Sequence, residues 1–192
     1  MINPTSYPVR LVVSALLFTV AAIGSTEEQP PENTEYFHAC SSGNLSTVTS
    51  LLEADPALVR TTTRDGEHCL HLSAFSGNAE IVKLLLEKGA DPDIRSTYEK
   101  GLRMHPLSWC TYYGRHEIIS LLLKYGADVN ADFDLGGEFE ENEDRVVTAL
   151  DVIEKILMDM SVDDERKPEF VETRNVLVRG GALRWASLKD EL

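Results

Sequence analysis

Apolar residues recur at helical spacing in two similar segments in the middle of the chain. The spacing is i, i+1, i+3, i+4, and the positions are Ile81, Val82, Leu84, Leu85 and Ile118, Ile119, Leu121, Leu122. This pattern predicts two helices, each burying one stripe of side chains. Gly89 and Gly126 follow the stripes, and because glycine adopts the left-handed backbone without a Cβ clash, we expect both helices to end there.

These helices belong to a longer internal repeat. Residues 65–95 recur as residues 102–130, and three landmarks keep an offset of 37 residues: Leu70 to Leu107, Gly77 to Gly114, and Gly89 to Gly126. Upstream, Gly43 to Gly77 is a spacing of 34 residues; downstream, residues 148–151 and 181–182 bracket a fourth, degenerate unit. One helix pair cannot bury its apolar face alone, so the units are expected to stack.

The repeat resembles the ankyrin family, whose unit is a β-turn and two helices marked by Thr-Pro-Leu-His-x-Ala. Residues 68–73, HCLHLS, keep the Leu and His of that motif, and residues 105–108, HPLS, keep its Pro and Leu. The resemblance covers about residues 34–183. It implies an all-α fold, a short ankyrin-repeat solenoid of about four helix-turn-helix units with β-turn fingers and a C-terminal cap.

The repeat frame divides the chain as follows. We expect a signal peptide at 1–24, a polar linker at 25–33, repeat units at about 34–64, 65–101, 102–145 and 146–183 with an acidic insertion at 131–145, and a tail at 184–192. Extra residues are expected around 160–168. In this frame Thr173 and Arg174 fall where Ile81 and Val82 sit, which predicts the polar outer helix that a terminal cap requires.

Composition and charge narrow the function classes. The 192 residues carry a formal charge of −14, with 26% charged and 43% hydrophobic residues, as expected of a packed soluble domain. An acidic chain without a Lys/Arg block is a poor partner for nucleic acid or an anionic membrane. No catalytic or phosphate-binding motif occurs in the sequence, so we expect neither an enzyme nor a cofactor.

The N-terminus has the pattern of a secretory signal. Arg10 precedes an uncharged run of 13 residues, Leu11 to Ile23, and polar residues return at Ser25. A membrane-spanning helix needs about 20 apolar residues, whereas a signal-peptide core needs about 7 to 15. We therefore expect cleavage before Ser25 and no stable membrane insertion afterwards; the alternative is a buried N-terminal helix or strand.

Two further signals agree with entry into the secretory pathway. The tetrapeptide Lys189, Asp190, Glu191 and Leu192 spells the KDEL retrieval signal, which implies the endoplasmic reticulum lumen and a retrieval receptor as one partner. Asn44 begins the glycosylation sequon Asn-Leu-Ser; its alternative role is a helix N-cap. A cytosolic ankyrin adaptor remains the alternative if the terminal signals are not used.

The three cysteines are predicted to be reduced and buried. Cys40 and Cys110 lie two units apart, and Cys40 and Cys69 lie in neighbouring units but differ by about five positions along the helix, which adds about 7 Å to a helix separation of about 8 to 10 Å. A disulfide needs Cα atoms within about 7 Å. A zinc site is also disfavoured, because the repeat frame explains these cysteines as small buried residues.

The acidic insertion offers a candidate calcium loop. Starting at Asp132, carboxylates fall at loop positions 1, 3, 9 and 12, and Gly137 falls at position 6, as in an EF-hand. Position 9 is Glu140, and the residues taken as candidate calcium ligands are Asp132, Asp134, Glu138 and Glu143. Against this reading, Gly136 offers no side-chain ligand at position 5 and no helix precedes the loop. An acidic luminal calcium-binding protein and a solvated acidic insertion are both left open.

The remaining candidate is a surface for an unknown protein ligand in the secretory pathway. In ankyrin repeats partners usually meet the loop tips and the last exposed positions of the first helix. The resemblance places Phe75, Ser76, Tyr112 and Tyr113 at those positions in units two and three, and exposed aromatic residues are frequent interface hot spots. Arg95, Tyr98 and Lys100 would add a basic edge, and Trp109 is expected in the core. The alternative is that Phe75 or a tyrosine folds back onto its neighbour helix.

Overall fold

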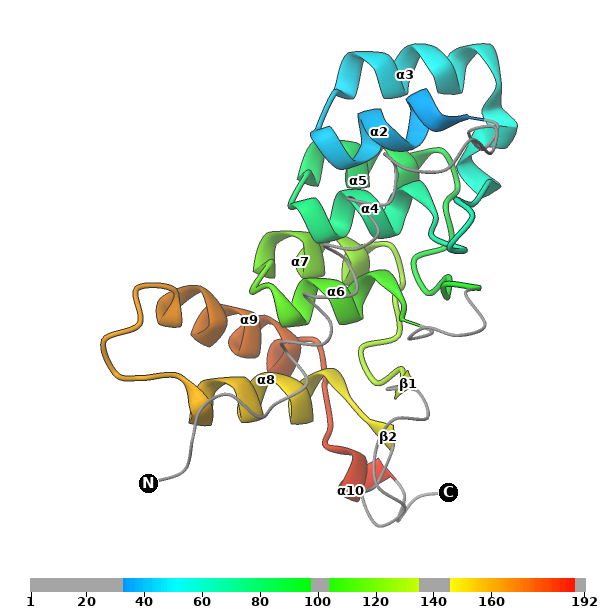
Figure 1. Cartoon of the computed structure of the whole chain (residues 1–192). Coiled ribbons are helices and arrows are strands. Elements are labelled where there is room, and N and C mark those ends of the chain that lie inside the picture. The colour runs from blue at the N-terminus through cyan, green and yellow to red at the C-terminus, as the bar shows by residue number, and fades with distance from the viewer. Residues whose placement is uncertain (1–32, 98–103, 135–145, 189–192) are drawn as a thin grey trace. The chain divides into compact units, whose positions relative to one another are not determined.

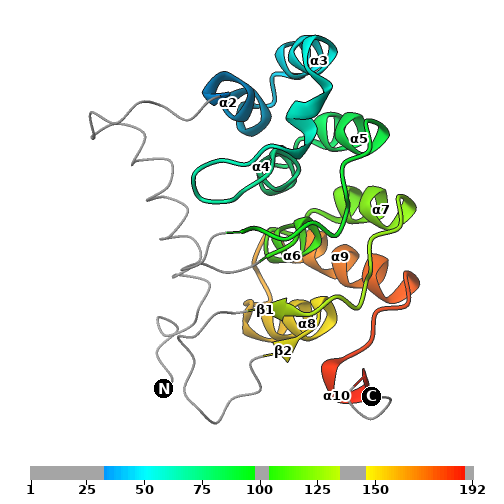
Figure 2. The same ribbon diagram turned by 90° about the vertical axis from the view of Figure 1, so that its right-hand side faces the viewer.

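The protein is a stack of helix pairs in a computed structural model that describes residues 33–97, 104–134 and 146–188. The pairs are α2 (Thr34–Ser42) with α3 (Leu45–Ala54), α4 (Cys69–Ser76) with α5 (Ala79–Glu87), α6 (Pro106–Tyr112) with α7 (His116–Lys124), and α8 (Ala149–Asp159) with α9 (Lys167–Arg179). Figure 2 shows the first helices of the pairs in one column, the inner helices, and the second helices in the other, the outer helices. The all-α solenoid is confirmed.

Short elements join and close the pairs. The 3-10 helix η2 (Pro56–Arg60) follows α3, and the one-turn helix α10 (Trp185–Leu188) follows α9. Strands β1 (Phe133–Asp134) and β2 (Val146–Val147) pair antiparallel at the two ends of the acidic insertion, with Phe133 opposite Val147. The four KDEL residues, 189–192, lie outside the described residues.

The outer helices form because each buries an apolar stripe. In α5 the buried side chains are Ile81, Val82, Leu85 and Leu86, and in α7 they are Ile118, Ile119 and Leu122. Leu84 and Leu121, which the sequence pattern places in the stripe, are only half-buried. The predicted stripe therefore exists, but in α5 it also includes Leu86, the residue after Leu85.

Glycines between the two helices of each pair fix how neighbouring units meet. Gly43, Gly77 and Gly114 have φ values of +79°, +85° and +70°. A side chain at or near the N-terminal end of the next unit's outer helix lies against each of them: Asn78 on Gly43, Arg115 on Gly77, and Phe170 on Gly114. Because Phe170 takes the place that Asn78 and Arg115 take in earlier units, the geometry supports the register assigned to the degenerate fourth unit.

The fourth unit buries more than its sequence indicates. Thr173 is fully buried, with its hydroxyl donating to the Glu169 carbonyl at 2.9 Å, and α9 also buries Phe170, Val176 and Leu177. The expectation of a polar residue facing solvent at Thr173 is wrong, because satisfying the hydroxyl within the helix lets threonine occupy a core position.

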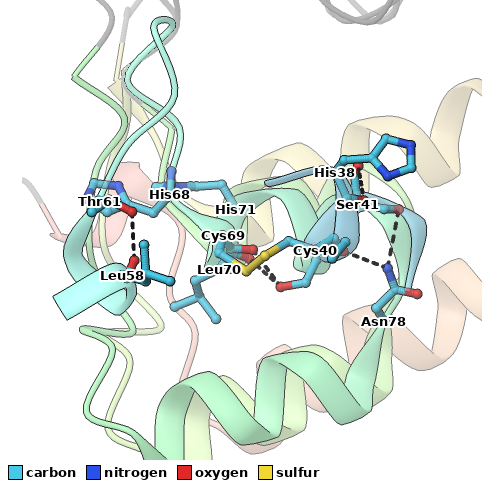
Figure 3. Close-up of a disulfide and its surroundings, with 12 residues drawn as sticks. His38, Cys40, Ser41, Leu58, Thr61, His68, Cys69, Leu70, His71 and Asn78 are labelled. Carbon is cyan, nitrogen blue, oxygen red and sulfur yellow. Dashed lines mark hydrogen bonds between the residues drawn. A yellow bond between two sulfur atoms is a disulfide. The ribbon is translucent and has the colours of Figure 1, made fainter. Parts of the chain in front are cut away.

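The prediction of three reduced cysteines is also wrong. Cys40 in α2 and Cys69 in α4 form a disulfide with their Cα atoms 5.5 Å apart, while Cys110 is free and buried (Figure 3). The prediction applied the separation of helix axes, about 8 to 10 Å, to the Cα atoms themselves. Cα atoms lie about 2.3 Å from the axis of their helix, so on the facing sides of two packed helices they come closer together than the axes do.

Candidate partner-binding surface

The predicted aromatic residues form a cluster rather than three separate exposed rings. Phe75 at the end of α4 meets Tyr113, just after α6, edge-on with ring centroids 4.7 Å apart, and meets Trp109 at 5.9 Å. Trp109 is buried, as expected, whereas Phe75 and Tyr113 are half-buried. Phe75 thus folds back onto the next inner helix. Edge-to-face pairs of this kind hold the rings in fixed orientations.

Tyr112 and Ser76 complete this part of the surface. Both are half-buried. Burial raises the pKa of Tyr112 to about 12, which is further from physiological pH than the ordinary tyrosine pKa, and its phenol is protonated. Burial also raises the pKa of Tyr113, with the neighbouring Arg115 guanidinium acting in the opposite direction. The accessible parts of the cluster are therefore uncharged, and they suit an apolar or hydrogen-bonding partner group.

Unit one contributes a polar end to the same row of positions. Ser41 and Ser42 are exposed, and their hydroxyls donate to the carbonyls of His38 and Ala39 within α2. The side-chain amide of Asn78, the N-cap residue of α5, donates to the Cys40 carbonyl at 3.0 Å, which is visible in Figure 3. The row of inner-helix ends, Ser41, Ser42, Phe75, Ser76, Tyr112 and Tyr113, is called the inner-end surface below.

Arg95 does not join the inner-end surface. It precedes α6, so it lies toward the N-terminal ends of the inner helices, whereas Phe75 lies at a C-terminal end. Its guanidinium donates to the Asp132 carboxylate at 2.7 Å and to the Asp132 carbonyl at 2.9 Å. The expected basic edge is corrected accordingly: Arg95 links two successive finger loops, and its charge is paired. Tyr98 and Lys100 lie outside the described residues.

The same ion pair bears on the candidate calcium loop. Asp132, the first proposed ligand, has an oxygen already engaged by Arg95. Glu138 and Glu143 lie outside the described residues, and Asp134 is described only as part of β1. Within the described residues no group of three or more His, Cys, Asp or Glu side chains is arranged to hold a metal ion.

A buried polar cluster at the start of α4 was not predicted from the sequence. His71 is buried; its Nδ1 accepts from the His68 backbone N–H at 3.1 Å, and its Nε2 faces the carbonyls of Ile94 and Met104 at 2.9 and 3.1 Å. The ring therefore ties α4 to the loop that leads into the next unit. Burial lowers the pKa of His71 to about 3, so the ring is neutral.

Glu67 lies beside this neutral ring. Its Oε2 is 3.5 Å from His71 Nδ1, a distance that fits an ion pair, but the two groups do not form one because the ring carries no charge. Burial raises the pKa of Glu67 to about 7, against a lowering by a hydrogen bond with Ser96. The motif at residues 68–73 identifies His71, but nothing in the spacing indicates that Glu67 turns inward.

Comparison with known proteins identifies the fold family. A family model described as ankyrin repeats (3 copies) matches residues 12–96 and 36–133. The chain belongs to the ankyrin-repeat family. Ankyrin repeats are protein–protein interaction modules, so this ankyrin-repeat chain is a protein-binding module in its general class.

Curated relatives match the ankyrin-repeat chain only over part of their own length. An ankyrin repeat and SAM domain-containing protein 6 of Danio rerio is 33% identical over 84 residues, covering 44% of this chain and 11% of that protein. The E3 ubiquitin-protein ligase XB3 of Oryza sativa is 38% identical over 60 residues, 31% of this chain and 13% of that protein. The human NAD-capped RNA hydrolase NUDT12 is 34% identical over 61 residues, 32% and 13% respectively. Because these matches cover only ankyrin repeats, they do not indicate that this chain shares the catalytic activity of any of these proteins.

Asn44, the predicted glycosylation site, caps a helix. Asn44 is exposed and is the N-cap of α3, its Oδ1 accepting from the Thr47 N–H at 3.2 Å and the Ser46 hydroxyl at 2.9 Å. The capping role is confirmed, and glycosylation stays a prediction.

Across the described residues, no helix combines the length and apolar character that crossing a bilayer requires.

Proposed function

We propose that this ankyrin-repeat chain is a non-catalytic protein-binding module of the endoplasmic reticulum lumen. The observation that carries the location is the Cys40–Cys69 disulfide. Structural disulfides persist in oxidising compartments and are rare in the cytosol. The disulfide is independent of the predicted signal peptide and of Lys189, Asp190, Glu191 and Leu192, yet it favours the same compartment.

The inner-end surface is the proposed site for the protein ligand. Phe75 is held against Trp109 and Tyr113 by edge-on contacts, and α4, which carries Phe75, is cross-linked to α2 by the Cys40–Cys69 disulfide. A partner that docks there orders little of this chain on binding, which keeps the entropy cost of association low. Aromatic anchors with restricted rotamers are the residues that most often dominate such contacts.

The location is tested with a full chain tagged after Ser25. We expect retention of the intact chain in the endoplasmic reticulum and secretion when Lys189 to Leu192 are deleted. Asn44→Gln should remove any endoglycosidase-sensitive mass, whereas Asn78→Gln, at the equivalent place but without a sequon, should not. A cytosolic chain carrying three free thiols would overturn the luminal proposal and favour the cytosolic adaptor.

The binding surface is tested by site-specific photo-crosslinking. A photoreactive residue is placed at Ser76, which leaves the aromatic cluster intact, and in a matched variant at Lys83, whose side chain is 58% exposed on α5. We expect cross-links to luminal proteins from position 76 that are absent from position 83 and lost with Phe75→Ala. Equal cross-linking from both positions would refute the inner-end surface as the site.

A further inference from the structure

A cation beside the inner-end surface has no carboxylate partner. Arg115 lies in the turn after Tyr113, and its guanidinium packs over Gly77, where an added Cβ would be 3.1 Å from the Arg115 Cζ. In the part of the chain that the structure describes, no Asp or Glu side chain is within ion-pair distance of Arg115. Other arginines do form ion pairs, namely Arg95, Arg166, Arg174, Arg179 and Arg184.

The Arg115 guanidinium is held in place although it is not paired. Its Nε is buried without a hydrogen-bond partner among the described residues, while Arg115 as a whole is half-buried. Gly77 is the C-cap of α4, and the dipole of that helix puts only about half a negative charge there, so the guanidinium is attracted but not neutralised. Because its position is already restricted, the group loses little freedom when a partner binds.

The equivalent residue of the preceding unit is used inside the chain. Asn78 is the N-cap of α5, as Arg115 is the N-cap of α7, and its side-chain amide donates to the carbonyls of Cys40 and Ser41 at 3.0 and 3.4 Å. The Arg115 side chain makes no such bond to α4 within the described residues. Its terminal nitrogens therefore remain able to donate to a partner.

The inner ends of units one to three lack acidic residues. The segments 36–52, 68–79 and 105–116 contain the C-terminal ends of these inner helices and the turns after them, and they have no Asp or Glu, although 32 of the 192 residues are acidic. The next acidic residues after the second and third segments, Glu80 and Glu117, are exposed on the outer helices. At 0.1 M salt, charges more than about 10 Å away are largely screened, so the local balance decides what binds. It favours an anionic group, whereas the formal charge of −14 alone would favour a basic partner.

An aromatic surface adjoins the guanidinium. Phe75 lies two residues before Gly77 and packs edge-on against Tyr113, with ring centroids 4.7 Å apart. A guanidinium presents its donors in a planar fork that matches a carboxylate, and half-buried rings accept an apolar side chain. The ligand that complements both features is a peptide segment with a large apolar side chain close to an Asp or Glu.

We propose that the protein ligand of the inner-end surface presents an Asp or Glu carboxylate to Arg115 and an apolar side chain to Phe75 and Tyr113. This rests on the proposed binding function and adds the chemistry of the ligand. Arg115 then determines specificity for acidic segments. A charge-assisted hydrogen-bonded pair of this kind changes affinity by about tenfold.

Peptide selection tests the chemistry of the ligand. A phage library of random short peptides is selected on the oxidised full chain, on Arg115→Gln and on Lys124→Gln. Lys124→Gln is the matched control, because it removes the same charge from an exposed position at the other end of α7. We expect Asp and Glu near apolar residues to be enriched on wild type and Lys124→Gln but not on Arg115→Gln. Equal enrichment on all three chains, or none on wild type, would overturn the proposal.

Affinity measurements with one selected peptide identify the pair and also use the unaltered chain. Replacing the acidic residue of the peptide by its amide should weaken binding to wild type about tenfold and leave binding to Arg115→Gln nearly unchanged, because two groups that form one pair lose its energy only once. Arg115→Lys should keep part of the affinity, since it keeps the charge but not the planar fork. If Arg115→Gln weakens both peptides equally, Arg115 only supports the turn and the proposal is wrong.

Phe75→Ala separates this proposal from the proposed function. We expect it to weaken binding of the acidic peptide and of its amide form alike. Peptides that depend on Phe75 but not on Arg115 would overturn the acidic specificity and leave the inner-end surface as the binding site. Peptides that bind wild type and Phe75→Ala equally well would overturn both.

Discussion

Reduction of the Cys40–Cys69 disulfide should destabilise the repeat stack by an amount that the sequence separation sets. The two cysteines are 29 residues apart. A cross-link across a loop of that length removes chain entropy from the unfolded state worth about 3.6 kcal/mol at 25 °C. This is a large share of the roughly 5 to 15 kcal/mol that stabilises a typical domain.

Urea unfolding followed by circular dichroism measures the effect. With an m-value of about 2 kcal/mol/M, the oxidised chain should unfold at a urea concentration about 2 M higher than the same chain reduced in denaturant and refolded with reductant. Thiol titration of the unreduced, denatured chain should find one free thiol, that of Cys110.

Two variants separate the cross-link from other effects of the reductant. In Cys110→Ala the difference between oxidised and reduced chains should persist, and in Cys40→Ala/Cys69→Ala it should vanish. Three titratable thiols in the denatured, unreduced chain, or a shift below about 0.5 M, would refute the reasoning.

Further predictions concern buried charge and backbone strain. Burial raises the pKa of Glu67 from 4.5 to about 7, so the folded state binds the Glu67 proton more tightly than the unfolded state does. The free energy of unfolding should therefore fall as pH rises from about 4.5 to 7, by at most about 3 kcal/mol. In Glu67→Gln the urea midpoint should no longer show this fall. In the Glu67→Gln background stability should instead fall as pH drops below 6.5, because His71 stays neutral when folded but is protonated when unfolded; midpoints that do not change between pH 6.5 and 4 would contradict this. Gly114→Ala should lower the melting temperature more than Gly89→Ala: both have positive φ, but a Cβ at 114 would lie 3.3 Å from the Phe170 ring and one at 89 meets nothing within 4 Å. Equal losses would show that backbone strain alone matters.

Sequence spacing predicted the repeat but not the inward turns of single side chains. The 37-residue offset places Leu70 and Leu107 correctly in the core, and the same register holds for Phe170 over Gly114. These features follow from periodicity, which every unit repeats. Departures occur where one residue depends on a particular neighbour, as Glu67 does on Ser96, with which it forms a hydrogen bond.

The candidate surface was predictable in part for the same reason. Motif alignment finds Phe75 and Tyr113, because their positions recur in each unit. It does not find the pairing of Arg95 with Asp132, which depends on how two lengthened loops of different sequence meet. The disulfide was not predicted because the separation of helix axes was used in place of the shorter distance between Cα atoms on their facing sides, which is 5.5 Å for Cys40 and Cys69.

The position of the disulfide in the chain also bears on how the correct thiols find each other during synthesis. Cys40 and Cys69 belong to the first two units, and Cys110 follows 41 residues after Cys69. Because polypeptides emerge from the ribosome N-terminal end first, the native pair can join before the third thiol emerges. Cys110 is then buried when the third unit packs on the first two. The N-to-C order of synthesis therefore disfavours incorrect disulfide pairing.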